Sequence, residues 1–180
     1  YHEVIALTHT LAGEICINGE VIDFTGGKGY IDKEWGKAYP NVWIWAQCNQ
    51  FKQSDMAMML GVMRHQLFLD YQTSFVVPIY YQGQLEVFAN YNGGHIAKLY
   101  RYKGYIHIVI TQKNKLLDLK IYGQDEVDLA MSRNAHMIKD VYNCMNAKIE
   151  VKLTQNGMVL LEKTGYDVQL EIGGNTSKLK

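Results

Sequence analysis

The sequence predicts an all-β fold, with one antiparallel sheet closed into a barrel or folded into a sandwich. Two observations support this prediction. Apolar residues recur at every second position, as in Ile149, Val151 and Leu153, which is typical of half-buried antiparallel strands. Turn-forming pairs such as Asn156-Gly157 separate these runs at intervals of roughly ten to fifteen residues.

The individual elements follow from the same two signals. Alternation marks strands at 117–121, 149–153 and 168–172. Glycine-containing turns that favour positive φ lie between the runs, at Asn18-Gly19, Gln82-Gly83, Asn92-Gly93-Gly94 and Lys103-Gly104. The one segment that allows a helical interpretation is 126–137. With no long polar linker between the runs, we expect residues 1–180 to form a single domain.

Composition and charge exclude several classes of partner. The chain has 18 basic and 18 acidic residues, so its formal net charge is zero and no field attracts nucleic acid or anionic lipid. No apolar run approaches the roughly 18 residues of a membrane-spanning helix. Cys16, Cys48 and Cys144 are odd in number and far apart, which favours a reducing compartment. We therefore expect a soluble, cytoplasmic protein without a nucleic-acid partner or a transmembrane segment.

The spacing of histidines, cysteines and glycines does not indicate a metal site or a cofactor site. The six histidines show neither i, i+2 nor i, i+4 pairing and lie beside no cysteine cluster. The glycines of 26–29 begin no dinucleotide-binding or Walker pattern, and no G-x-S-x-G motif is present. We expect no metal and no cofactor.

One stretch differs from the rest of the chain. Residues 23–51 read DFTGGKGYIDKEWGKAYPNVWIWAQCNQF and hold all three tryptophans. This string resembles the tocopherol cyclase-like family, whose members carry the run GxGYxEKxWGxxFPxxWxWxQxNxF. The matching positions are Gly27, Gly29, Tyr30, Trp35, Gly36, Pro40, Trp43, Trp45, Gln47, Asn49 and Phe51. The departures keep charge and aromaticity, since Asp32-Lys33-Glu34 replaces the more usual Glu-Lys-Asp and Tyr39 stands where Phe is common.

The resemblance implies both a fold and a relation to a longer protein. Members of the family consist of two lipocalin-like β-barrels, so residues 1–180 would form one such barrel, the C-terminal half of a two-barrel protein. The expected partners are the N-terminal barrel or a second copy of the chain, together with a lipophilic small molecule. Residues 55–82 depart from the family pattern.

The resemblance also implies a reaction, in which a prenylated phenol or terpenoid forms a ring after protonation of an alkene. Such chemistry needs a carboxylic acid that burial keeps protonated and aromatic rings that stabilise a cation. Asp32 and Glu34 are the candidate acids, and they share one face of an extended segment with Tyr30. One of the two would act as the acid, and its neighbour or Tyr30 would relay the proton.

The remaining motif residues would contact the ligand. Trp35, Trp43 and Trp45 would form a partly buried cluster whose ring faces stabilise the cation, and Gln47 and Asn49 would bind the ligand beside them.

Two other interpretations of the same residues stay open. The chain could be a non-catalytic lipocalin-like carrier of a hydrophobic molecule, or a structural domain that completes a partner's cavity. In a purely structural interpretation the tryptophans plug the end of the barrel or pack against the other half of the protein, Asp32 pairs with Lys33, and Glu34 caps backbone amides. Only the cyclase hypothesis predicts ring closure by the purified protein.

Overall fold

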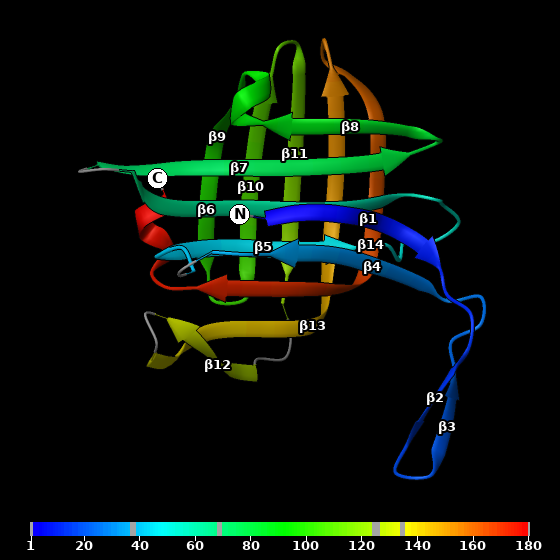
Figure 1. Ribbon diagram of the computed structural model, residues 1–180. Coiled ribbons are helices and arrows are strands. Elements are labelled where there is room, and N and C mark those ends of the chain that lie inside the picture. The colour runs from blue at the N-terminus through cyan, green and yellow to red at the C-terminus, as the bar shows by residue number, and fades with distance from the viewer. Residues whose placement is uncertain (1, 37–38, 68–69, 124–126, 134–135, 180) are drawn as a thin grey trace. The chain divides into compact units, whose positions relative to one another are not determined.

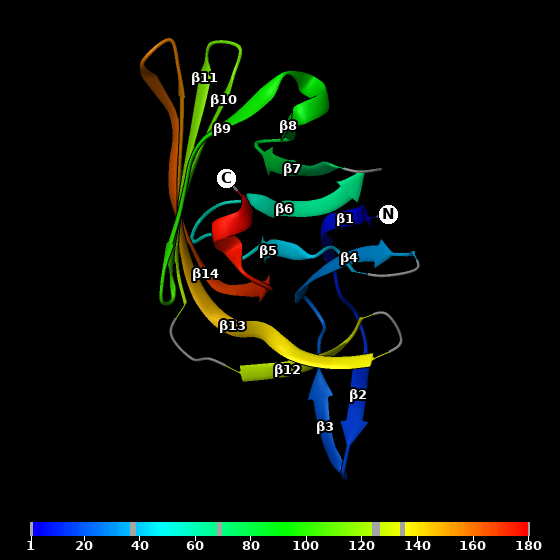
Figure 2. The same cartoon turned by 90° about the vertical axis from the view of Figure 1, so that its left-hand side faces the viewer.

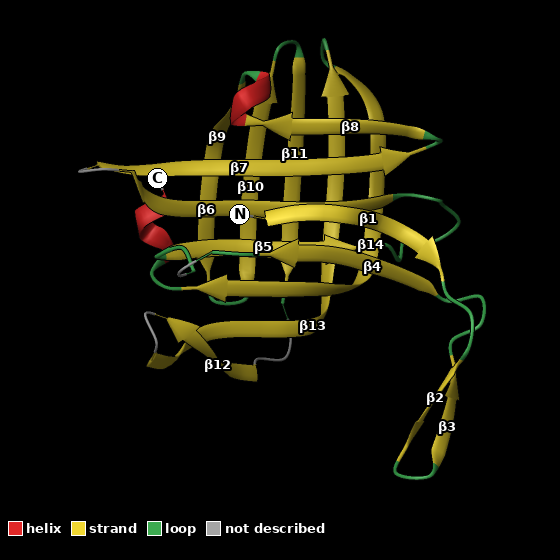
Figure 3. Cartoon of the chain, in the orientation of Figure 1, coloured by secondary structure: helices red, strands yellow, loops and turns green. Residues whose placement is uncertain are grey.

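The computed structural model describes residues 2–36, 39–67, 70–123, 127–133 and 136–179. Strands dominate the described chain, and the helices are two short 3-10 turns (Figure 3). The all-β prediction is therefore confirmed. Among the described residues, no helix has the length and apolar character needed to cross a membrane. The chain divides into two compact units, Tyr1–Gly36 and Lys37–Lys180.

The first unit contains two antiparallel strand pairs. Its strands are β1 (His2–Thr10), β2 (Glu14–Ile17), β3 (Glu20–Asp23) and β4 (Lys28–Glu34). β1 pairs with β4, and β2 pairs with β3. The β2–β3 turn is the predicted Asn18-Gly19 pair, in which both residues have positive φ, at 52° and 86°.

The second unit is one curled antiparallel sheet of ten strands. Its elements are β5 (Val42–Cys48), β6 (Ala57–Leu67), β7 (Asp70–Tyr81), β8 (Gln84–Ala89), η1 (Asn90–Asn92), β9 (Gly94–Tyr102), β10 (Tyr105–Gln112), β11 (Lys115–Tyr122), β12 (Val127–Arg133), β13 (His136–Gln155), β14 (Met158–Gly173) and η2 (Thr176–Leu179). The strand order is β8-β7-β6-β5-β14-β13-β11-β10-β9, with β12 paired to β13.

Within this sheet the strands form two layers that cross. Strands β9, β10 and β11 run upright in Figure 1, whereas β5 to β8 run across them. The long strands β13 and β14 belong to both layers, because each curves from one layer into the other (Figure 2). The core lies between the layers, where alternate residues point inward: Ile106, Ile108 and Ile110 of β10 are fully buried.

The helical interpretation of residues 126–137 is wrong. Val127–Arg133 is strand β12, and β13 begins at His136. An antiparallel ladder with β13 supplies the backbone hydrogen bonds of β12, from Val127↔Asn143 to Arg133↔His136. Pairing with a neighbouring strand thus overrides a weak local preference for helix. Residues 126, 134 and 135 lie outside the described part of the chain.

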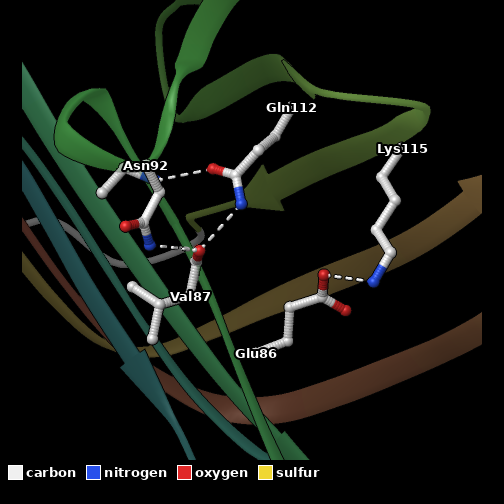
Figure 4. A network of polar contacts seen from close by, with 6 residues as sticks. Glu86, Val87, Asn92, Gln112 and Lys115 are labelled. Atoms are coloured by element: carbon white, nitrogen blue, oxygen red, sulfur yellow. Dashed lines mark hydrogen bonds and ion pairs between the residues drawn. The ribbon is translucent and has the colours of Figure 1, made fainter.

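Hydrogen bonds of one side-chain amide, that of Gln112, link the two edges of the sheet. Strands β8 and β9 are the terminal strands of that order and are consecutive in sequence. Gln112 of β10 accepts a hydrogen bond from the Ala89 amide at 3.1 Å and donates to the Val87 carbonyl at 3.0 Å (Figure 4). Beside it, Lys115 pairs with Glu86 at 2.5 Å. These contacts connect β8 to β10 and β11 where a strand ladder would otherwise close a barrel.

Candidate functional site

The first group of candidate residues surrounds Asp32 in the first unit. Asp32 Oδ2 accepts a hydrogen bond from the Tyr30 hydroxyl at 2.9 Å. The same oxygen lies 2.9 Å from His2 Nε2. The β1–β4 ladder places Val4 opposite Asp32 and His2 opposite Glu34, so the histidine and both acids share one face of the strand pair. Strand alternation thus brings Tyr30 and Asp32 together, and strand pairing adds His2.

Burial distinguishes the two candidate acids. The side chain of His2 is 7% exposed and that of Asp32 is 28% exposed, whereas Glu34 is exposed. Asp32 is the carboxyl group with defined partners in a partly buried setting. The two candidates thus differ in burial, and Asp32 has two hydrogen-bond partners.

Lys33 lies on the opposite face of β4 and pairs with a different acid. Its Nζ is 2.9 Å from Glu3 Oε2 and 5.2 Å from the centre of the Trp35 ring. The Asp32–Lys33 pair of the structural interpretation is therefore not formed. Trp35 is 49% exposed and is covered in part by the Lys33 side chain.

Both partners of Asp32 meet the same oxygen, and this has a chemical consequence. A carboxylic acid that carries its proton on Oδ1 keeps Oδ2 as an acceptor for Tyr30 and His2. When the proton leaves, the same two hydrogen bonds stabilise the negative charge that develops on the carboxylate. The arrangement can therefore support proton donation by Asp32.

The second group of candidates lies on β5 in the second unit. Alternation along this strand directs Val42, Ile44, Ala46 and Cys48 into the hydrophobic core. Trp43, Trp45 and Gln47 consequently point to the other face of the sheet, which we call the outer face of β5. Asn49 follows the strand and is 7% exposed.

Trp43 is held tightly on this face. Its indole Nε1 donates to Glu171 Oε1 at 2.6 Å, and its ring stacks on Tyr39 with centroids 5.7 Å apart. The benzene half of the indole lies directly over Gly173, where a Cβ would approach three ring atoms to between 2.2 and 2.4 Å. Trp43 is only 7% exposed, whereas Trp45 is half-buried. The environment of Trp43 fits the structural interpretation of this tryptophan.

Two residues that contact the candidate site residues were not identified from the sequence. Glu171 of β14 lies opposite Trp45 in the β5–β14 ladder and binds Trp43. His2 contacts Asp32 from another strand. The alternation of Glu171 with Leu170 and Ile172 signalled that it faces away from the core, but no local signal identified its neighbours.

The predicted site residues are therefore divided between the two units. Tyr30, Asp32, Glu34 and Trp35 belong to the first unit, and Trp43, Trp45, Gln47 and Asn49 belong to the second. A cluster that unites all three tryptophans stays a prediction. Within the described ranges, no group of three or more His, Cys, Asp or Glu residues is arranged to hold a metal ion.

Comparisons with known proteins were made for both sequence and structure. A family model described as tocopherol cyclase-like matches residues 2–174. The chain is 29% identical over 80 residues to the probable chloroplastic tocopherol cyclase of Oryza sativa subsp. japonica, a match that covers 42% of this chain and 17% of that protein. The chloroplastic tocopherol cyclase of Zea mays is 30% identical over 80 residues, with the same coverage of both chains.

The fold has a solved counterpart. The crystal structure of kievitone hydratase from Nectria haematococca superposes with a TM-score of 0.50 at 14% sequence identity. The superposition covers 91% of this chain and 49% of that one, so the chain spans about half the length of this structural neighbour. At such low identity the likeness concerns the fold alone, and it confirms the predicted lipocalin-like β-barrel.

Proposed function

The chain belongs to the tocopherol cyclase-like family, and on this basis we propose that it acts in a cyclase- or hydratase-type reaction on a lipophilic alkene. Ring closure of a prenylated phenol or a terpenoid is the specific reaction proposed. The observation that carries the proposal is the environment of Asp32, a partly buried carboxyl group whose Oδ2 meets both Tyr30 and His2 at 2.9 Å.

Asp32 is the proposed proton donor. The alkene electron pair takes the proton from Oδ1, and a tertiary carbocation forms on the substrate. Tyr30 and His2 remain hydrogen-bonded to Oδ2 and stabilise the carboxylate left behind. Hydrogen bonds that strengthen as charge develops lower the barrier to the reaction more than they strengthen substrate binding.

Aromatic rings are the proposed stabilisers of the cation. A ring face contributes about 0.5 to 2 kcal/mol to the stability of a nearby cation. Trp45 is half-buried on the outer face of β5 and is the better candidate in its unit, because the ring of Trp43 already packs against Tyr39 and Gly173. Trp35 is the candidate in the first unit.

The oxygen nucleophile decides which reaction results. If a phenolic hydroxyl of the same substrate captures the cation, a ring closes. If water captures it, the product is a tertiary alcohol. The same acid and the same aromatic rings serve both reactions, so the proposal covers cyclase and hydratase chemistry.

A second barrel is the proposed partner of this chain. The chain spans 49% of the kievitone hydratase chain. The β2–β3 hairpin exposes apolar side chains that a partner would cover, since Ile15 is 52% exposed, Ile17 51% and Val21 57%. We assign this role to an N-terminal barrel of the same protein or to a second copy. Cytoplasmic localisation stays a prediction that cell fractionation would test.

Substitution of Asp32 tests the proposal. The full chain, with its partner barrel present, is assayed for ring closure of a hydroquinone that carries one geranylgeranyl chain. Asp32→Asn keeps the shape of the side chain and removes the proton, so turnover should fall by about 10² to 10⁴-fold while binding persists. Glu34→Gln is measured in parallel, and a larger loss for that variant would reverse the assignment of the acid.

The chain offers a matched control for this substitution. Asp118 also contacts a histidine, with its Oδ1 2.9 Å from His107 Nε2, and its side chain is 27% exposed. Asp118→Asn also removes a carboxylate that contacts a histidine, so it should lower the stability of the protein about as much as Asp32→Asn does. It should leave turnover unchanged. Binding of the hydroquinone without turnover by the unsubstituted protein would favour the carrier hypothesis instead.

A further inference from the structure

Strand β9 has one edge that no other described strand covers. It is the outermost of the upright strands in Figure 1, and its backbone ladder runs to β10 alone. Only half of the N–H and C=O groups of an antiparallel strand point toward a given neighbour, so the other half of those in β9 point to the open edge. We infer that this edge binds an extended acidic segment of a partner protein, which adds to the sheet as a further strand. This role goes beyond the proposed reaction and does not depend on it.

The other end of the sheet order differs in this respect. Side-chain amides bond backbone groups of β8, since Gln112 binds the Ala89 amide and the Val87 carbonyl, and Asn92 donates to the same carbonyl at 3.1 Å (Figure 4). Within the described part of the chain, no loop or side chain makes such bonds to residues 95–102 at the open edge of β9. This edge therefore keeps donors and acceptors for another strand.

A groove follows the open edge. It has a volume of about 370 Å³ and is lined on one side by residues 99–103. Across from them it is lined by Asn175, Thr176 and Ser177. A second groove, of about 570 Å³, is lined by residues 95–99. Consecutive residues line each groove, as expected along the edge of a strand, because only alternate side chains share a face.

The part of this edge that best suits a new strand is residues 98–102. The register of β9 against β10 is regular from Lys98 to Tyr102. Beyond Lys98 the register shifts, between Val109 and Ile110 of β10. Such irregularities commonly protect sheet edges from pairing, so the first half of β9 is less suitable. The regular part has the length of an ordinary short strand.

The charges along the two grooves favour an acidic partner. The described residues that line them include no acidic side chain and three cationic ones, which are Lys98, Arg101 and Lys103. Two copies of β9 paired at this edge would bring these cations together, and like charges on paired strands are destabilising. A segment that carries carboxylates gains from the same cations.

Arg101 offers the carboxylate a specific position. Its guanidinium lies 5.8 Å from the centre of the Tyr142 ring, and this contact holds the side chain in place. Its Nε is buried and donates to no acceptor among the described residues. A buried donor without an acceptor is costly, and a carboxylate on the added strand would supply an acceptor in a charge-assisted hydrogen bond.

Strand alternation determines the residues beside that carboxylate. Tyr100 and Tyr102 flank Arg101 in sequence and point to the opposite face of the sheet, where they are 46% and 60% exposed. The neighbours of the partner's carboxylate would therefore lie beside these two rings, and β-branched side chains pair well with aromatic rings across strands. The expected motif is an acid between two apolar residues, such as Val-Glu-Val.

Labelled peptides test the inference on the full chain by fluorescence anisotropy. The probe is a fluorescein-labelled peptide, Ser-Thr-Val-Glu-Val-Thr-Ser. The same peptide with Lys in place of Glu should bind about tenfold more weakly or worse, because its charge repels the cations of the groove. Two further versions of the probe carry N-methyl groups on one or the other set of alternate residues. Only the version methylated on the edge that faces β9 should lose binding, since the other edge faces solvent.

A substitution in the protein tests the role of Arg101. Arg101→Met keeps an aliphatic stem and removes the guanidinium, so the preference for the Glu peptide over the Lys peptide should fall from about tenfold to about threefold or less. The matched control is Lys52→Met. Lys52 also lies over a tyrosine, 4.9 Å from the centre of the Tyr166 ring, but it lines neither groove. This control should keep the full preference. The peptide comparison in the unsubstituted chain stands even if Arg101→Met fails to fold.

Hydrogen exchange gives the position of the bound peptide. Amides within residues 98–102 should exchange about tenfold more slowly or less when the Glu peptide is bound, and those of β8 should not change. Equal affinity for the Glu and Lys peptides, equal affinity for the two N-methylated versions, or unchanged exchange in β9 would overturn the inference. Arg101→Met should leave the sedimentation profile of the chain unchanged. Loss of a larger species in this variant would assign the edge to a second copy and would also overturn the inference.

Discussion

Trp43 donates its indole N–H to Glu171 at 2.6 Å, although the two residues are 128 positions apart in the sequence. Their strands, β5 and β14, are adjacent in the sheet, and the ladder runs from Gln169↔Gln47 to Gly173↔Trp43. The contact therefore fixes an aromatic ring and a carboxylate on one face of the barrel. Its stability depends on Gly173, over which the ring lies.

Gly173→Ala should destabilise the protein by about 1 to 3 kcal/mol. The added Cβ would lie 2.2 Å from the nearest ring atom of Trp43, so the ring must leave the position in which it donates to Glu171. Urea denaturation followed by tryptophan fluorescence measures the loss. Gly61→Ala is the control, since a Cβ there would meet its neighbours at ordinary contact distances from 3.6 Å. An equal loss of unfolding free energy in the two variants would show that the absence of a side chain at Gly173 is not what allows the Trp43 ring to pack there.

Gln112→Leu should also destabilise the protein, by about 2 kcal/mol. The substitution leaves the Ala89 amide without its acceptor and removes a donor to the Val87 carbonyl, and unpaired buried polar groups carry a cost of this size. Gln84→Leu on the same β8 edge, where the glutamine is exposed, should change the free energy of unfolding by less than about 0.5 kcal/mol. A negligible effect of Gln112→Leu in urea denaturation would mean that this amide does not join the ends of the sheet.

Tyr30→Phe should lower turnover by about 10 to 100-fold while leaving affinity for the hydroquinone unchanged. The variant keeps the ring and removes one of the two hydrogen bonds to Asp32 Oδ2, which matters most when the carboxylate becomes charged. Steady-state kinetics with the partner barrel present gives the measurement. Tyr91→Phe, at a tyrosine that is 76% exposed, is the control. If the loss appears in KM alone, Tyr30 binds substrate and does not assist Asp32.

The β2–β3 hairpin should mediate association. A two-stranded hairpin that exposes Ile15, Ile17 and Val21 gains little stability alone in water, so we expect the isolated chain to self-associate. Sedimentation velocity should reveal a dimer or larger species, and Ile17→Lys with Val21→Lys should shift it to monomer. A well-behaved monomer before substitution would contradict the proposed covering of this hairpin by a second barrel.

The sequence predicted the fold well because strand alternation and turn residues are local signals. Ile149, Val151 and Leu153 point into the core as their spacing indicates, and the Asn156-Gly157 turn joins β13 to β14. The segment 127–133 was misjudged because its strand forms by pairing with β13, which no local pattern reveals.

Of the candidate site, the sequence predicted only the residues that belong to the motif in 23–51. Alternation placed Tyr30 and Asp32 on one side of β4, and the hydrogen bond between them follows. His2 reaches Asp32 across 30 positions and Glu171 reaches Trp43 across 128. Such contacts depend on strand register, which is determined by the whole sheet and not by neighbouring residues.

Alkene protonation is the central claim, and turnover in deuterium oxide tests it most directly. The geranylgeranyl hydroquinone is incubated with the full chain and its partner barrel in deuterium oxide, and the product is analysed by mass spectrometry and nuclear magnetic resonance. The exchangeable proton of Asp32 is then a deuteron, so the account predicts one non-exchangeable deuterium per product molecule, on the former alkene carbon. Product without carbon-bound deuterium, or no product from bound substrate, would contradict the account.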